Sequence, residues 1–460
     1  MFINIITVIF SVLSFAFPAC SQSFDLDSIR ADSLPAAEVP AVNGGAAVIA
    51  PAEPKEWTIM VYASVKDSLG GDQIQNLMAL KRTGTTDRVN IVAESGFTFA
   101  VPGEEISTPT LRMLLTKSTS YSSLDSDTLS IEQSVDMGDW RRVAAFIAWA
   151  KTSYPAKRYV FVPFGHGNGF FDYKKNPKAE KSTLSDKQTH NYVTVPEFGR
   201  VLKETGRVDV LLYLSCLMQT AEAAYEVKDY VDVIVGSEEL MSSIGYDMGL
   251  LAETLDSRPG VSSAELGSIM AKSYVDRVRA HPDKISGGQA SVIFAPKLGE
   301  FSTRLDGWVK AALELKDEAA AVKARKEAAR FDIFGITTVS TNTAQISLGS
   351  ISGDLYDFVG IYTRNLPQDT PAQLLARRKG LELMEFISNE MLAGFYYTGT
   401  TRLGLDFART HGISIHLPPA RPLFASYQEL EANTENSYSD FAFAKDGSWK
   451  QFMDWLYSIK

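Results

Sequence analysis

One cysteine and one histidine carry the clearest chemical signal in this sequence. Cys216 follows the apolar run 208–214, and His166 stands between two glycines after the apolar run 158–164. A cysteine thiolate is a nucleophile, and an imidazole can take up and return a proton, so the pair predicts nucleophilic hydrolysis. The two residues are 50 positions apart, close to the histidine–cysteine spacing known for one group of cysteine hydrolases.

The elements that must position this pair are short apolar strands separated by helical patterns. Nearly continuous apolar runs, typical of strands covered on both faces, occur at 57–63, 89–93, 111–115, 158–164, 208–214 and 231–235. Helices are predicted to start after Asp139 and at the Thr194–Glu197 capping box. This alternation predicts an α/β fold with a mostly parallel sheet between helices. Ligands bind beyond the carboxyl ends of such strands, where both residues lie.

The surroundings of Cys216 predict how its thiol is activated. A helix expected over residues 218–228 would place the sulfur at a positive helix end, which lowers the pKa of a thiol. The backbone N–H groups of Gly167 and Cys216 are candidates for an oxyanion hole. Each residue also has a plainer interpretation, because a lone cysteine is often a small core residue and a histidine between glycines can be a turn residue.

Composition excludes several other functions. The 460 residues carry a net charge of −10, which argues against a general nucleic-acid role. Two cysteines do not make a disulfide framework. The five histidines are scattered, and no glycine-rich phosphate loop is present, so neither a metal site nor a nucleotide site is expected.

The N-terminus predicts export. Residues 1–20 form an apolar signal that ends in small residues, and Cys20 stands where a bacterial lipoprotein carries its lipid. Residues 21–55 are rich in Ala, Pro and Ser and are expected to be a linker or pro-segment. A catalytic domain is expected over 56–255, with an α+β region over 256–460 packed on it.

In combination these motifs resemble the clostripain family of cysteine peptidases, relatives of caspases, legumain and gingipains. The resemblance spans residues 56–460 and its specific part is the histidine and cysteine motifs. The matching segments are Trp57–Tyr62, Asp136–Asp139, Gly165–Gly167, Cys216–Met218 with Glu222, Val235–Glu239, His411–Ile415 and Phe441–Asp446 with Trp449.

The resemblance implies a caspase-like domain, a dyad of His166 and Cys216, and cleavage of proteins or peptides after basic residues. It also implies self-processing between histidine and cysteine, for which Lys175 and Lys178 in the lysine-rich loop 174–187 are candidates. No cofactor is required, although some relatives need calcium.

One position departs from the family. Two residues before the cysteine, where the family has an acidic residue that binds the basic side chain, this chain has Leu214. The next residue, Ser215, is a candidate for contact with the substrate. A buried basic side chain needs a carboxylate. Candidates for this role are Glu238, Glu239 and Asp247; otherwise the pocket favours a small or apolar residue.

The first hypothesis is therefore an exported cysteine endopeptidase of the bacterial envelope or exterior. The alternative is a weak or inactive homologue that binds proteins or peptides as a surface lipoprotein, held at the membrane through Cys20. Hydrolysis of a non-peptide ester or amide is a third option.

Overall fold

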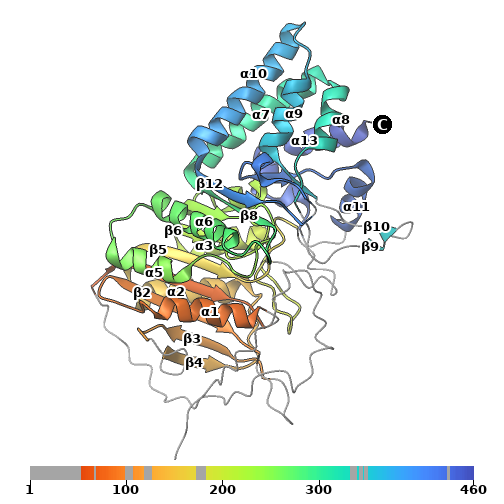
Figure 1. Cartoon of the computed structure of the whole chain (residues 1–460). Helices are drawn as coiled ribbons and strands as arrows, with labels where there is room; N and C mark the ends of the chain where they lie inside the picture. The colour runs from red at the N-terminus through yellow and green to blue at the C-terminus, as the bar shows by residue number, and fades with distance from the viewer. Residues whose placement is uncertain are drawn as a thin grey trace, which may run out of the picture.

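A nine-stranded sheet runs through the molecule (Figure 1). The computed structural model describes residues 53–66, 69–98, 107–118, 127–171, 183–331, 339–340, 345–346, 351–402, 404–431 and 436–459. Across the sheet the order is β12 (Leu392–Gly399), β8 (Gly287–Phe294), β7 (Val231–Gly236), β6 (Val208–Leu212), β5 (Ala156–Phe164), β1 (Lys55–Ala63), β2 (Val89–Gly96), β3 (Thr110–Leu114) and β4 (Thr128–Glu132).

The five central strands, β7, β6, β5, β1 and β2, are parallel, and the strands at both edges are antiparallel. Short strands outside this sheet are β9 (Val339–Ser340), β10 (Gln345–Ile346), β11 (Ser352–Asp354) and β13 (Ser414–His416). The predicted α/β fold with a mostly parallel sheet is confirmed. Because β8 and β12 both lie beyond residue 255, the C-terminal half contributes strands to the same sheet.

Side-chain alternation along the central strands separates two cores. In β5, Val160 and Val162 face one core and Phe161 faces the other. The first core is covered by α1 (Gly70–Lys81), α5 (Met248–Ser257) and α6 (Ser263–Arg279), and the second by α2 (Trp140–Ser153), α3 (Val195–Thr205) and α4 (Ala221–Val227). Successive strand residues point to opposite faces, so a strand with apolar residues throughout needs cover on both.

Two helices, α2 and α3, begin directly after a residue whose side chain caps the first turn. Asp139 accepts the N–H of Arg141 and so caps α2. Thr194 and Glu197 form the predicted capping box at the start of α3, with a proline in its first turn.

The edge strand β4 is a feature that the sequence did not reveal. The sequence pattern marks no strand here, yet Thr128–Glu132 pairs with β3. Its side chains are exposed or half-buried, as expected for an edge strand with water on one side. A polar edge strand lacks the apolar run that marks a central one.

The C-terminal half adds a helical region next to the β12 edge (Figure 1). It contains α7 (Leu298–Leu315), α8 (Glu318–Glu327), α9 (Leu355–Asn365), α10 (Pro371–Phe386), α11 (Arg421–Glu431), α12 (Ala442–Asp446) and α13 (Trp449–Ser458). Trp308 of α7 lies at its centre, against Phe358, Tyr362 and Phe452. Within the described residues, no helix has the length and apolarity that a membrane span requires.

Phe170 joins the loop after β5 to this C-terminal region. Its ring is buried and makes edge contacts with His416, Tyr427, Tyr438 and Phe441 at centroid distances of 5.0 to 6.2 Å. Edge-to-face ring contacts add stability beyond the burial of area. The C-terminal region therefore anchors the chain four residues after His166.

Replacing Phe170 by alanine should lower the free energy of unfolding by about 3–5 kcal/mol, because a buried ring leaves a cavity. Urea unfolding of the purified chain measures this. Tyr397→Ala is the control, since that ring is 42% exposed and its loss should cost far less. Equal effects of the two substitutions would show that Phe170 is not an anchor.

Candidate active site

Parallel pairing brings the two predicted catalytic loops side by side. Val160 pairs with Val210, Phe161 with Leu211, and the bridge from Phe164 to Leu214 continues the register. Each pair is separated by 50 residues, as are His166 and Cys216. The same register, continued into the two loops that follow, places His166 opposite Cys216.

Gly167 is the direct contact between the two loops. A Cβ atom at this glycine would lie 2.2 Å from the carbonyl oxygen of Cys216 and 3.1 Å from its nitrogen. Only a residue without a side chain allows such an approach. His166 itself is 8% exposed, and Cys216 is half-buried.

The sulfur of Cys216 contacts the backbone of Met241, whose carbonyl oxygen lies 3.8 Å from Sγ. The N–H of Met241 points at Sγ with a distance of 3.3 Å. A donor aimed at sulfur favours the thiolate over the thiol. The helix expected from residue 218 begins only at Ala221, because Thr220 is its cap. The expected helix therefore starts later than residue 218, and activation of Cys216 by its N-terminus stays a prediction.

The turn after Cys216 is sharp and strained. Leu217 has φ +63°, a left-handed conformation that costs a non-glycine residue about 1–2 kcal/mol. Its N–H donates to the carbonyl of Glu239 at 3.2 Å, and Gly169 leaves room for its carbonyl. The loop after β7 thus holds the cysteine turn in place.

Three apolar side chains surround this turn. Leu217, Leu240 and Phe331 form a small cluster against Cys216. Nothing in the sequence pattern marked Phe331 or Met241 as neighbours of the cysteine, since both come from other parts of the chain.

The residues before Cys216 are buried. Leu214 is 6% exposed and packs on Gly245, where a Cβ atom would lie 2.8 Å from its Cδ1. Ser215 is 2% exposed, and its Oγ has no hydrogen-bond partner among the described residues. Its side chain lies under Gly167, so the predicted contact of Ser215 with substrate would have to come from its backbone.

Glu238 lies in the interior of the protein. It is fully buried, and its Oε2 accepts the N–H of Gly412 at 2.8 Å. Burial and the nearby Asp354 raise the pKa of Glu238 well above its usual value, and burial raises the pKa of Asp354 to about 7. The prediction that Glu238 binds a basic substrate side chain is not supported by this position, because its carboxyl group has no open surface.

The other two predicted acidic residues are engaged in backbone contacts. Glu239 is 4% exposed, and its Oε1 accepts the N–H of Leu240 at 2.7 Å. Asp247 caps α5 by accepting the N–H of Leu250 at 3.0 Å. It also lines a hollow of about 700 Å³ together with Arg277, a residue that the sequence analysis did not single out. Arg277 gave no signal because it belongs to an ordinary amphipathic helix.

Comparison with known proteins identifies the family. A model of the clostripain family, peptidase C11, matches residues 98–455. The chain belongs to the clostripain family. Clostripain of Hathewaya histolytica is 26% identical over 141 residues, which are 28% of this chain and 27% of that protein. The match thus covers little more than a quarter of the curated relative.

Solved structures of C11 proteases share the fold. An inactive zymogen from Parabacteroides distasonis has a TM-score of 0.58 and 17% identity, with 86% of this chain and 99% of that chain covered. A secreted C11 cysteine protease from Bacteroides thetaiotaomicron has the same TM-score and coverage, with 14% identity. The caspase-like fold expected for the clostripain family is confirmed.

Other predicted sites fall outside the described residues or remain predictions. Cys20, Lys175 and Lys178 are among the residues that the structure does not describe. In the described part of the chain, no group of three or more His, Cys, Asp or Glu side chains is placed to hold a metal ion. That no cofactor is required stays a prediction, and calcium stays a candidate only through the family resemblance.

Gly167→Ala should destabilise this clostripain-family chain by about 1–3 kcal/mol, because the new methyl group overlaps the backbone of Cys216. It should also change the rate at which iodoacetamide alkylates Cys216, the only described cysteine. Gly260→Ala is the control, since nothing lies within 4 Å of its Cβ position. Unfolding curves that coincide for both variants would contradict the close contact.

The buried pair of Glu238 and Asp354 predicts a pH effect on stability. A carboxyl group whose pKa is raised by folding holds its proton more tightly in the folded state. The stabilisation that this bound proton gives the folded state is complete below the carboxyl pKa of the unfolded chain, about 4. It is lost as pH rises through the pKa in the folded state, which is about 7 for Asp354.

Glu238→Gln keeps the shape and removes one of the two acids. The free energy of unfolding of this variant, minus that of wild type, should therefore rise by about 1–2 kcal/mol between pH 5 and pH 8. Urea unfolding across this range measures the difference. Glu253→Gln changes an exposed carboxylate and should give a flat profile; a flat profile for Glu238→Gln would rule out the buried pair as the cause.

Proposed function

We propose that this chain is an exported cysteine endopeptidase in which Cys216 is the nucleophile and His166 the general base and acid. The observation that carries the proposal is the contact of the Gly167 loop with the backbone of Cys216, in the register set by β5 and β6. Family membership supports the reaction class.

In this mechanism His166 takes the proton of the Cys216 thiol, and the thiolate attacks the carbonyl carbon of the scissile bond. The Met241 N–H, 3.3 Å from Sγ, stabilises the thiolate before attack. His166 then gives the proton to the leaving amine, which breaks the C–N bond and leaves a thioester. Water, deprotonated by His166, hydrolyses the thioester and restores the thiol.

The backbone N–H groups of Gly167 and Cys216 are the proposed oxyanion hole. They belong to two loops in close contact, as the 3.1 Å from the Gly167 Cβ position to the Cys216 nitrogen indicates. Donors fixed by the backbone need no reorganisation when charge develops on the oxygen.

Export and processing complete the proposal. The signal at residues 1–20 directs the chain out of a bacterial cell, and lipid on Cys20 would hold it at the envelope. A secreted C11 protease among the similar structures agrees with this location. Self-cleavage after Lys175 or Lys178 would separate the histidine part from the cysteine part.

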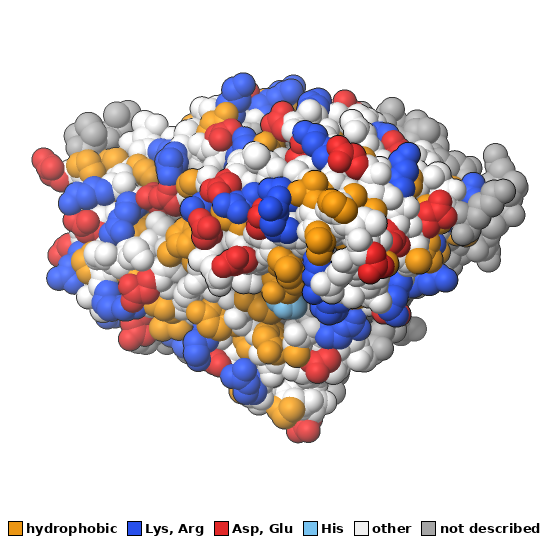
Figure 2. All heavy atoms as spheres, turned by 90° about the horizontal axis from the view of Figure 1, so that it is seen from above, with side chains coloured by type: hydrophobic (Ala, Val, Ile, Leu, Met, Phe, Trp, Pro, Cys, Tyr) orange, Lys and Arg blue, Asp and Glu red, His pale blue; other side chains and the backbone are white. Residues whose placement is uncertain are grey.

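Substrates are proteins or peptides, and nucleic acid is not among the proposed partners. On the face seen in Figure 2, basic and acidic side chains are interspersed, and no extended area of one sign is visible. The alternative, a weak homologue that only binds peptides, is favoured by Leu214 in place of the family's acidic residue.

A peptide-library digest tests the proposal. Cys216→Ala and His166→Ala should each lower the cleavage rate at least about a thousandfold, since each removes a reacting group. His190→Asn is the control, because this exposed histidine has φ +55°, a conformation that asparagine tolerates. Library cleavage that is absent in wild type, or unchanged in Cys216→Ala, would favour the binding alternative.

Mass spectrometry of the same preparations tests maturation. Wild type should yield fragments ending at Lys175 or Lys178, and Cys216→Ala should stay intact over this loop. An intact wild-type chain after long incubation would remove self-processing from the proposal.

A further inference from the structure

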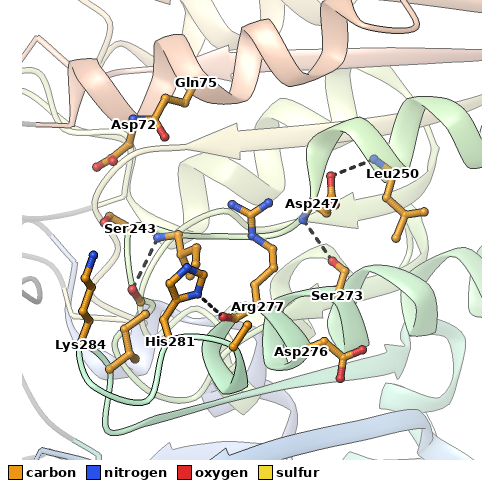
Figure 3. Close-up of a pocket in the computed structure, with 14 residues that line it drawn as sticks. Asp72, Gln75, Ser243, Asp247, Leu250, Ser273, Asp276, Arg277, His281 and Lys284 are labelled. Carbon is orange, nitrogen blue, oxygen red and sulfur yellow. Dashed lines mark hydrogen bonds between the residues drawn. The ribbon is translucent and has the colours of Figure 1, made fainter. Parts of the chain in front are cut away.

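The hollow lined by Asp247 and Arg277 begins one residue after the residue that contacts the nucleophile. Met241 donates to Sγ of Cys216, and the next residue, Ser242, lines the hollow. The other walls are the start of α1, the C-terminal half of α6 and the segment after it, as Figure 3 shows.

The hollow is also on the side of the sheet to which the cysteine points. Leu214 and Cys216 both pack against the core that α1, α5 and α6 cover, and these are the helices that line the hollow. Its volume of about 700 Å³ exceeds that of any single side chain. A substrate residue next to the scissile bond could therefore enter it.

The carboxylates of the hollow are already engaged. Asp276 forms ion pairs with Lys272 and Arg279. Asp247 accepts the N–H of Leu250 at the start of α5, and Asp72 lies in the first turn of α1, where the helix dipole favours a negative charge.

Arg277 is different, because its guanidinium group points into the hollow without a partner (Figure 3). It makes no hydrogen bond or ion pair with any described side chain, and its Nε is buried and unsatisfied. Burial lowers the pKa of Arg277 below the usual value of an arginine, and the charge of Asp247 opposes this shift. The group stays charged, and a partly buried unpaired cation is stabilised by an anion.

Lys284 adds a second positive charge. It is exposed, lines the same hollow, and its ammonium group has no ion pair within the described part of the chain. A basic substrate side chain would meet these two cations, whereas an acidic one could accept hydrogen bonds from Arg277 in the planar geometry that guanidinium groups favour.

We propose that this hollow is a substrate subsite for an acidic side chain, held by Arg277 with Lys284 at the rim, next to the bond that Cys216 attacks. This assignment rests on the proposed peptidase function and deepens it. It differs from the preference for basic residues that the family resemblance implies, and Leu214 agrees with it, because an acidic residue there would repel the same substrate.

Binding to the full-length Cys216→Ala chain tests the subsite without cleavage. Four acetylated peptides that differ only in having Glu, Gln, Lys or Leu on the acyl side of the scissile bond are titrated by calorimetry. The Glu peptide should bind about tenfold to a hundredfold more tightly than the Gln peptide, as expected for charge-assisted hydrogen bonds.

Further substitutions in the Cys216→Ala chain show which side chains cause the preference for the Glu peptide. Arg277→Gln should abolish the Glu preference, and Lys284→Gln, at an exposed position, should weaken Glu binding about threefold. Arg258→Gln is the matched control: this exposed arginine pairs with Glu265 outside the hollow, and its loss should leave all four affinities unchanged.

The outcomes separate this inference from the proposed function. Equal binding of the Glu and Gln peptides, tighter binding of the Lys peptide, or a Glu preference that survives Arg277→Gln overturns the subsite. If the Glu preference is found but wild type cleaves none of the four peptides, the subsite stands and the peptidase function falls. If wild type cleaves only the Lys peptide, the peptidase stands and the subsite falls.

Discussion

The parallel pairing of β5 with β6 is the constraint on which the candidate site depends. Its register joins residues 50 positions apart, and this fixes which residues of the two following loops lie opposite each other. A shift by one residue would turn every side chain of β6 to the other face. The buried valines and leucines of both strands oppose such a shift, because each core would then lose its apolar contacts.

The loops beyond these strands depend on the C-terminal half as well. Gly412 donates to the buried carboxyl group of Glu238, which lies three residues before Met241. Phe170 inserts its ring among the aromatic residues of the C-terminal region. The histidine loop and the loop that contacts the sulfur are thus each tied to the same region, which acts as part of the scaffold of the site.

Sequence reasoning recovered the features that arise from strong local patterns. Apolar runs identified the central strands, and the capping box identified α3. It missed features set by contacts between distant segments. Met241 as a donor to Cys216 depends on the path of the loop after β7, and the burial of Glu238 depends on Gly412, more than 170 residues away. The late start of α4 was missed because Thr220, not the first apolar residue after the cysteine, is its cap.

The donor that meets the sulfur is a main-chain amide, and this has an evolutionary consequence. Any residue except proline at position 241 presents the same N–H, so the donor is indifferent to most substitutions there. The groups that line the neighbouring hollow are side chains, and each can change by a single substitution. Reactivity and selectivity are therefore encoded in different parts of the polypeptide. A lineage with this architecture can exchange one kind of substrate for another without passing through a form that has lost its nucleophile.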